Sequence, residues 1–467
     1  MKLSLTQLHI LFEIAKQNGI IILKEMLEVV HMSKEIIKPS ILAGFMELTP
    51  SDQILFNKMM DTIRKNYEKF GFLPIDTPVI EKAEILLAKG GGETEKQIYR
   101  FQKGDTDMAL RFDLTVPLAR YVAQHYSELT FPFRRYHIGK VYRGEKAQRG
   151  RFREFYQCDV DIIGNGKLDI INDAEIPRVI YSTFKDLGFD EFTIKINNRK
   201  ILNGFFKSLE VENTVEVLRA IDKLEKIGEK GVISELEELG LERAIIDKIL
   251  EFINIKGKNE EILTKLKELN IDNEVFQEGV KELETVSHYI GVFGVPEKNF
   301  AIDLTIARGL DYYTGTVYET FLDDYPEIGS ICSGGRYDDL ASYYTKQKLP
   351  GVGVSIGLTR LFYQLREANL IKAVDNTLTE VLVIPMENCL EKAIQIANKL
   401  RDNEINTQIY LEDVKLGKKF GYADKLDIPY VIIIGTEEIE NNRYTLRDMK
   451  TGEQASLNLE ELINHLK

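Results

Sequence analysis

The sequence predicts an α+β fold built on a mostly antiparallel sheet, and three observations support this prediction. Between residues 39 and 198, short β-rich runs alternate with helical runs, without the regular cadence of strand–helix–strand units. Residues 201–291 contain no proline and carry apolar residues at helical spacing throughout. Residues 380–467 alternate strands and helices, which is typical of a small α/β domain. A chain of 467 residues is long enough for about two to four such domains.

Residues 1–38 are predicted to form an N-terminal helical extension. Apolar residues recur there every three or four positions, which predicts helices at 5–19 and 23–37. The pair could be a helix-turn-helix DNA reader or a helical hairpin packed against the body or a partner. We favour the hairpin and expect no DNA partner.

The remaining elements follow from the same patterns. An amphipathic helix is predicted at 54–70, before the Gly71 turn. Strands are predicted at 98–101, 108–112, 133–142, 157–163, 192–196 and from 300 onward. In the C-terminal part, we expect strands at 381–386, 407–411 and 430–435, helices at 390–400 and 418–426, and a hairpin around 443–448.

Composition excludes several classes of protein. No apolar run approaches the roughly eighteen residues of a membrane span, and polar residues interrupt the N-terminus where an export signal would need an apolar core. Three cysteines lie far apart (Cys158, Cys332 and Cys389), which excludes a disulfide scaffold and a cysteine zinc site. The six histidines form no HExxH motif. These features favour a cytoplasmic protein with no membrane partner and no protein-held metal.

Positive charge is concentrated in one short stretch. The chain has a net charge of −13, which argues against a protein that coats nucleic acid. Residues 134–153 nevertheless hold eight Lys or Arg and one acid, a net charge of +7 that leaves −20 for the rest. We therefore expect an anion site in this stretch.

Three segments carry residues that a structural core does not need. The first, at 110–117, is a strand ending in Asp113 and Thr115, which could equally cap a helix. The second, at 143–161, is a strand–loop–strand unit with arginines at both loop edges. These are suited to phosphate oxygens, although a solvated charged hairpin is the alternative. The third, at 307–319, joins an Arg-Gly turn to paired tyrosines, which could also be packing residues.

The glycine-rich run at 351–360 is not a dinucleotide fingerprint. A GxGxxG motif would need glycine at position 356, which is isoleucine.

Taken together, these segments resemble the class II histidyl-tRNA synthetases. RGLDYYTGTVYE and SGGRYDDL resemble the two signatures of that family, residues 137–163 resemble class II motif 2, and GVGVSIGLTRLF resembles motif 3. The resemblance covers nearly everything after the first forty residues. One departure is Thr359, where the family usually has Glu.

The resemblance implies a domain plan. Residues 39–370 would form the catalytic domain, a six-stranded antiparallel sheet with flanking helices and a helical insertion at about 201–291. Residues 380–467 would form an α/β anticodon-binding domain. A homodimer would be built around residues 71–81.

The resemblance also implies roles for eleven site residues. The histidine ring would be read by Asp161 and Tyr313, beside Tyr312, and the α-amino group would be held by Asp113, Thr115 and Gln157. Arg143 and Arg308 would be catalytic, contacting the substrate carboxylate and the ATP α-phosphate from opposite sides. Glu145 and Arg151 match contacts to adenine and the outer phosphates, and Arg360 matches the γ-phosphate contact.

These residue types suit histidine activation by ATP. Neutral imidazole offers one donor and one acceptor, and an ammonium needs oxygen acceptors. Fixed cations can neutralise charge that develops on phosphate, so no nucleophilic side chain is required. Mg²⁺ is expected with ATP, held partly through phosphates. The expected partners are ATP, L-histidine and tRNA(His).

Two rival functions remain at the level of sequence. One is a non-catalytic paralogue, such as the regulatory subunit of ATP phosphoribosyltransferase; such relatives typically degrade the RGLDYY segment and lack the anticodon-binding domain, both of which occur here. The other is a ligase on the same scaffold that acylates something other than tRNA.

Lys415, Lys418 and Lys419 are a candidate phosphate contact in the C-terminal domain, although a solvated lysine face is the slightly favoured interpretation.

Overall fold

The computed structural model describes residues 5–18, 37–88, 93–146, 149–221, 223–306, 312–374 and 376–467. The chain divides into two units, Met1–Ala43 and Gly44–Lys467. In the first unit, helix α1 (Leu5–Asn18) confirms the first predicted helix. The second predicted helix, at 23–37, lies almost wholly outside the described residues. Four apolar side chains of α1 are exposed: Leu8, Ile10, Phe12 and Ile14.

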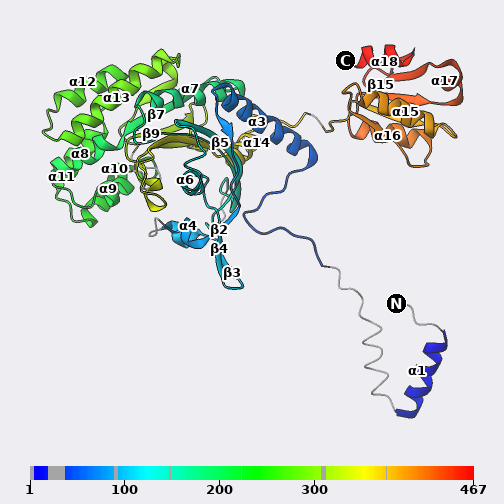
Figure 1. The fold of residues 1–467 in the computed structure, drawn as a ribbon, viewed down its shortest axis with the longest axis horizontal. Coiled ribbons are helices and arrows are strands. Elements are labelled where there is room, and N and C mark those ends of the chain that lie inside the picture. The colour runs from blue at the N-terminus through cyan, green and yellow to red at the C-terminus, as the bar shows by residue number, and fades with distance from the viewer. Residues whose placement is uncertain are drawn as a thin grey trace. The chain divides into compact units, whose positions relative to one another are not determined.

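A large sheet organises the body of the second unit (Figure 1). Its eight strands are, in spatial order, β1 (Leu73–Pro74), β5 (Phe133–Tyr142), β6 (Glu154–Ile163), β11 (Gly351–Ile356), β10 (Cys332–Tyr337), β9 (Thr316–Leu322), β7 (Phe192–Asn198) and β8 (Phe300–Ile302). The six inner strands are antiparallel, as expected, whereas β1 and β8 add a parallel strand at each edge.

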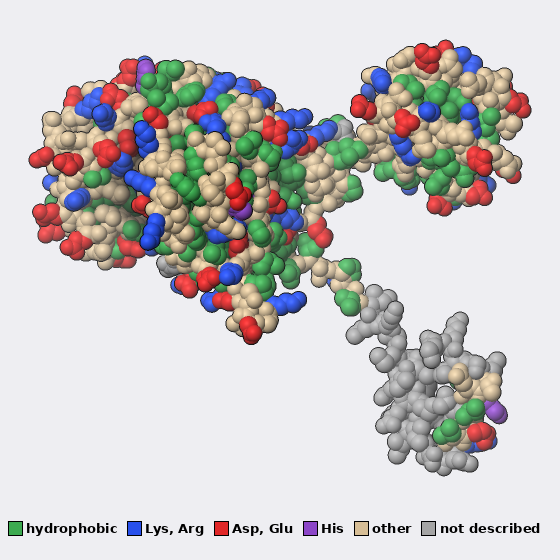
Figure 2. Space-filling model, viewed as in Figure 1, with side chains coloured by type: hydrophobic (Ala, Val, Ile, Leu, Met, Phe, Trp, Pro, Cys, Tyr) green, Lys and Arg blue, Asp and Glu red, His purple; other side chains and the backbone are tan. Residues whose placement is uncertain are grey.

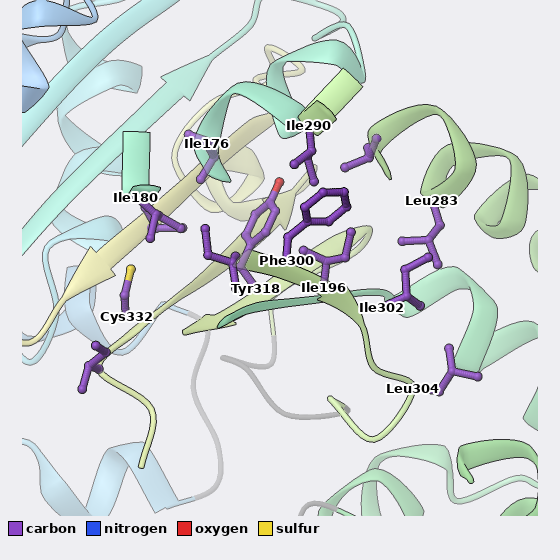
Figure 3. Close-up of a cluster of buried hydrophobic side chains, with 14 of the residues drawn as sticks. Ile176, Ile180, Ile196, Leu283, Ile290, Phe300, Ile302, Leu304, Tyr318 and Cys332 are labelled. Carbon is purple, nitrogen blue, oxygen red and sulfur yellow. The ribbon is translucent and has the colours of Figure 1, made fainter. Parts of the chain in front are cut away.

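One face of this sheet is covered by helices. These are α3 (Pro50–Lys69), α7 (Ile171–Asp186), α13 (Glu274–Val292) and α14 (Leu358–Glu367). Helix α3 begins four residues before the predicted start because Pro50 fits its first turn, where a missing N–H costs nothing. Figure 3 shows isoleucines of α7 and α13 packed against Phe300 and Tyr318 of the sheet. This apolar layer leaves the opposite face of the inner strands free to carry polar groups.

A smaller three-stranded sheet lies in the same unit, formed by β2 (Ile80–Lys82), β4 (Thr106–Leu110) and β3 (Arg100–Lys103). Three helices lie in the same part of the chain as this sheet: α4 (Ala83–Leu86), α5 (Glu93–Gln97) and α6 (Thr115–Gln124). The strand predicted at 98–101 actually starts at Arg100 and runs on to a turn at Gly104. Alternation alone places strand ends only to within a few residues.

The segment between β7 and β8 is helical, as its composition predicts. It contains α8 (Arg199–Ser208), α9 (Thr214–Ile221), α10 (Leu224–Glu238), α11 (Arg243–Ile253), α12 (Asn259–Glu268) and α13. Three short 3₁₀ turns, Glu297–Asn299, Pro326–Ile328 and Leu340–Tyr343, lie farther along the chain.

The C-terminal residues form a five-stranded sheet of their own, in the order β13 (Thr407–Ile409), β12 (Val381–Pro385), β14 (Tyr430–Ile434), β15 (Tyr444–Asp448) and β16 (Gln454–Leu457). The helices are α15 (Leu390–Arg401), α16 (Leu416–Lys425), α17 (Thr436–Asn441) and α18 (Leu459–Leu466). Two apolar clusters built only from this part of the chain pack its two faces. The predicted strands, helices and hairpin of this region are confirmed.

In the described part of the chain, no helix combines the length and apolar character needed to span a bilayer.

Candidate active site

A cavity of about 480 Å³ lies over the polar face of the large sheet. Ten of the eleven predicted site residues line it: Asp113, Thr115, Arg143, Glu145, Arg151, Gln157, Asp161, Tyr312, Tyr313 and Arg360. The eleventh, Arg308, lies outside the described residues. These residues come from stretches of sequence up to about 250 positions apart, so their meeting in one cavity is a property of the fold.

Strand β6 supplies the floor of the cavity through simple alternation. Gln157, Asp159 and Asp161 face the cavity, whereas Cys158 and Val160 between them are fully buried in the apolar core. Successive side chains of a strand point to opposite faces, so this strand carries polar groups on one side and core residues on the other.

Asp113 has one occupied and one free carboxylate oxygen. Oδ1 accepts the Val116 N–H at 3.1 Å in the first turn of α6, although the N-cap position itself is Leu114 and not, as the capping interpretation expected, Asp113 or Thr115. Oδ2 is buried and has no hydrogen-bond partner among the described residues. Burial raises the pKa of the Asp113 carboxyl to about 6, although the Val116 N–H and the charges of Arg143 and Arg135 act in the opposite direction. Capping thus leaves one oxygen available to a ligand.

Gln157 shows the same division between its two amide ends. Its Nε2 donates to Ser355 Oγ at 2.8 Å, and its Oε1 is buried with no hydrogen-bond partner in the part of the chain that the structure describes. Together with Asp113 Oδ2 and Asp159 Oδ1, it gives the cavity three oxygen acceptors that lack a partner among the described residues. A buried acceptor without a partner costs free energy, which a bound N–H donor would recover.

Asp161 is held by two neighbours. Arg135 Nη2 lies 2.6 Å from its Oδ2, and the Tyr337 hydroxyl donates to its Oδ1 at 2.7 Å. Burial raises the pKa of Asp161, while Arg135 and Tyr337 oppose the increase. A Cβ on Gly353 would lie 2.3 Å from Asp161 Oδ1, so only glycine fits opposite this carboxylate. Each oxygen keeps a further lone pair for a ligand.

Three tyrosine rings stand beside Asp161. The centroids of Tyr312 and Tyr313 are 5.0 Å apart, and those of Tyr312 and Tyr337 are 5.9 Å apart, in edge-to-face arrangements. Burial raises the pKa of Tyr313 above its ordinary value, so its hydroxyl stays protonated and can act as a donor. Tyr312 also packs in an apolar cluster, so it serves both as a packing residue and as part of the cavity wall.

Three of the residues that line the cavity are arginines: Arg143, Arg151 and Arg360. Arg143 donates to the Phe112 carbonyl at 3.0 Å and lies over the Phe155 ring, and among the described residues it forms no ion pair with a carboxylate. Burial and the positive charge of Arg151 lower the pKa of Arg360, which donates to the Ile328 carbonyl at 2.9 Å. Like charges held this close favour a bound anion.

Only part of the basic stretch contributes to this anion site. Carboxylates pair with Arg134, Lys140 and Arg149, and Arg151 lies 3.7 Å from Glu145. On the face shown in Figure 2, acidic and basic side chains are interspersed over the larger body. The net charge of +7 therefore identifies residues 134–153 correctly as the basic segment, but it overestimates how much of that positive charge is available to a bound anion.

Sequence reasoning missed four residues of the site. Asp159, Ser355 and Tyr337 line the cavity, and Arg135 supports it from the core. Asp159 could have been found, since it shares the strand face of Asp161. Arg135 could not, because its partner is set by the β5–β6 register, in which it lies opposite Asp161.

Thr359 has a structural partner of its own. Its buried hydroxyl accepts the Tyr156 N–H at 2.8 Å and so joins α14 to β6. A short side chain fills this position without a charge.

Comparisons with known proteins identify the family. A family model described as histidyl-tRNA synthetase matches residues 44–361, and one described as an anticodon binding domain matches residues 380–467. The chain belongs to the histidyl-tRNA synthetase family. The resemblance stated from the sequence is therefore confirmed.

Individual relatives agree with this membership. A histidine–tRNA ligase of Clostridium tetani is 69% identical over 437 residues, which cover 93% of this chain and 100% of the relative. One from Finegoldia magna is 54% identical, with 92% and 100% covered. The crystal structure of histidyl-tRNA synthetase from Nostoc sp. PCC 7120 matches with a TM-score of 0.83 at 42% identity, covering 92% of this chain and 99% of that chain. The predicted α+β fold is confirmed by this match.

A fourth match concerns the rival function. A Bacillus halodurans structure described as an ATP phosphoribosyltransferase regulatory subunit/histidyl-tRNA synthetase has a TM-score of 0.70 at 22% identity, covering 84% of this chain and 97% of that chain. At 22% identity, the likeness between this chain and the Bacillus halodurans structure shows a shared fold and nothing about function.

Proposed function

We propose that this protein is a histidine–tRNA ligase, an ATP-dependent enzyme that forms histidyl-adenylate and then esterifies the 3′ end of tRNA(His). The observation that carries the proposal is the composition of one cavity, which is lined both by buried oxygen acceptors that lack partners among the described residues and by arginines. An amino acid has an ammonium and a carboxylate, and ATP brings phosphates. The cavity offers partners of the matching sign to each.

Histidine is oriented by both ends of the molecule. Its ammonium donates to Asp113 Oδ2 and Gln157 Oε1, which are buried and have no partner among the described residues. Its ring lies between Asp161 and Tyr313, an acceptor and a donor. An amino acid without matching ring atoms would leave these buried groups unsatisfied, which is costly.

The reaction needs alignment and positive charge rather than a nucleophilic side chain. The substrate carboxylate oxygen attacks the α-phosphorus, the bond to the bridging oxygen breaks, and pyrophosphate leaves. Arg143 and Arg308 neutralise the charge on the α-phosphate, while Arg151 and Arg360 hold the outer phosphates and Glu145 contacts adenine. Fixed cations in a partly enclosed cavity stabilise such a transition state without reorganising solvent.

Mg²⁺ is proposed to enter with ATP. Among the described residues there is no cluster of three or more His, Cys, Asp or Glu side chains that could hold a metal. The cavity does carry the Glu319 carboxylate, whose negative charge acts on Arg360. This donor set fits an ion that is held mainly by phosphate oxygens, whose charge it would partly neutralise.

We propose that residues 39–370 form the catalytic domain and residues 380–467 read the anticodon of the tRNA. The second assignment is supported by the family match of that region. Lys415 and Lys418 are exposed and could contact phosphates, whereas Lys419 donates to the Pro385 carbonyl at 3.2 Å. We further place the enzyme in the cytoplasm.

A homodimer built around residues 71–81 is also proposed. Leu73 and Ile80 are 60% and 47% exposed there, and Val79 and Phe101 expose more apolar surface. Burying such side chains against a second copy is favourable. Sedimentation of the wild type and of Leu73→Asp tests this: the wild type should sediment as a dimer, and the variant should dissociate.

The function is tested by two assays on the same preparation. Histidine-dependent ATP–pyrophosphate exchange reports the first step, and charging of tRNA(His) reports the second. Both should be present. Exchange without charging of any tRNA would indicate a ligase with another acceptor, and the loss of both would indicate a non-catalytic paralogue.

A further inference from the structure

The amide of Gln157 can enter the cavity in two orientations that a substrate would distinguish. In the structure its Nε2 donates to Ser355 Oγ at 2.8 Å, and Oε1 is the end left free. Rotating the amide by half a turn would present an NH₂ group instead. An ammonium is attracted to the oxygen and repelled by the NH₂ group, so the orientation must be fixed for binding.

Ser355 can fix the orientation only if its own hydrogen is already engaged. A hydroxyl that accepts from Gln157 must donate elsewhere, and Asp159 lies directly opposite Ser355 in the β6–β11 register. A side-chain hydrogen bond from Ser355 is one of the influences that lower the pKa of Asp159. The Gln157-to-Ser355 bond and the cross-strand position of Asp159 fit a chain of hydrogen bonds that runs from Gln157 to Ser355 and on to the Asp159 carboxylate.

Asp159 is a suitable end for this chain of bonds. Its side chain is 2% exposed, and an ionised carboxylate accepts hydrogen bonds but donates none. Burial raises the pKa of Asp159 to about 7 against the opposing charge of Arg135, so the ionised carboxylate predominates above pH 7, where the exchange assay is run. If Ser355 donates to this carboxylate, it cannot also donate to Gln157 Oε1, so the reversed amide has no partner for its oxygen.

We propose that Ser355 and Asp159 are positioning residues that hold the carbonyl oxygen of Gln157 toward the α-ammonium group of histidine. The inference rests on the proposed role of Gln157 in binding that ammonium. Neither residue needs to touch the substrate, since each acts through the amide. Removing the Ser355 hydroxyl releases the amide, which then spends part of its time with its NH₂ group toward the substrate.

Steady-state ATP–pyrophosphate exchange provides the first test. Ser355→Ala should raise KM for histidine roughly five- to tenfold, about the effect of one hydrogen bond, with KM for ATP and the melting temperature close to wild type. Ser355→Thr keeps the hydroxyl and should restore the wild-type KM. In a Gln157→Ala background, Ser355→Ala should have no further effect, because the group it positions is gone.

Two inhibitors make the test specific for the ammonium. Histidinol has the amine and the ring but no carboxylate, whereas imidazole propionate has the ring and the carboxylate but no amine. Ser355→Ala should weaken competition by histidinol by the same factor as KM rises. It should leave competition by imidazole propionate unchanged.

The possible failures can be told apart. If Gln157→Ala leaves KM for histidine unchanged, the proposed role of Gln157 is wrong and the inference falls with it. If Gln157→Ala raises KM and Ser355→Ala does not, only the inference is overturned. If Ser355→Ala weakens both inhibitors equally, Ser355 shapes the cavity in general, and the positioning role is wrong.

Discussion

The guanidinium of Arg135 lies 2.6 Å from the carboxylate of Asp161, and both side chains are almost completely buried. Asp161 lines the cavity, whereas Arg135 is fully buried on the neighbouring strand and does not line it, so one ion pair joins a buried cation to the site. The two residues face each other across β5 and β6. A change at Asp161 therefore acts on substrate binding and on stability together.

Asp161→Asn should raise KM for histidine while KM for ATP stays close to wild type, because the amide can turn its NH₂ toward the ring donor. The same change leaves the Arg135 charge poorly compensated, and we expect a loss of about 3 kcal/mol in unfolding free energy. Exchange kinetics and denaturant unfolding measure the two effects. Equal losses for histidine and ATP would instead mark Asp161 as a structural carboxylate only.

Arg308→Ala should reduce ATP–pyrophosphate exchange by roughly two orders of magnitude or more, since it removes a cation that acts mainly in the transition state. The far-UV spectrum and melting temperature should match the wild type. Exchange at the wild-type rate would exclude the proposed role of Arg308.

Asp159→Asn should change how stability depends on pH. Burial raises the pKa of Asp159 to about 7, further helped by the charge of Asp161 and opposed by Arg135. The folded protein thus keeps this proton at pH values where the unfolded chain has lost it, and the associated stability is lost as pH rises from about 4 through 7. In the Asp159→Asn variant the side chain does not titrate, so this loss of stability with rising pH does not occur.

Unfolding free energies of wild type and Asp159→Asn, measured between pH 4 and 8, check this expectation. As pH rises, the unfolding free energy of the variant should increase relative to that of the wild type. The increase should be at most about 4 kcal/mol, at roughly 1.4 kcal/mol per unit of pKa shift. A constant difference across the range would show that Asp159 is ionised in the folded protein throughout.

Sequence reasoning went furthest where the pattern is local. The alternation of β6 and the apolar spacing of α15 follow directly from residue order: α15 matches the predicted 390–400 to within one residue, and β6 ends at the predicted Ile163 but begins three residues early, at Glu154. The family motifs predicted that distant residues such as Asp113 and Arg360 belong to one site, and both line the cavity. The partners of Arg135 and Ser355 could not be predicted, because strand register decides them and no local pattern records it.

A chain that ends at Thr379 should keep measurable ATP–pyrophosphate exchange but charge tRNA much more slowly. The C-terminal apolar clusters are built only from residues beyond this point, so their removal exposes no catalytic core. The salt dependence of tRNA binding should weaken as phosphate contacts are lost. Charging at the full-length rate by a soluble, dimeric truncated protein would show that this domain does not read the anticodon.

A crystal structure of the protein with L-histidine tests the central claim most directly. The account predicts that the substrate α-nitrogen lies within about 3.2 Å of both Asp113 Oδ2 and Gln157 Oε1, which are buried without partners among the described residues. The ring should then lie between Asp161 and Tyr313. A histidine bound in the cavity with its carboxylate toward Asp113, or with its α-nitrogen away from both oxygens, would contradict the account.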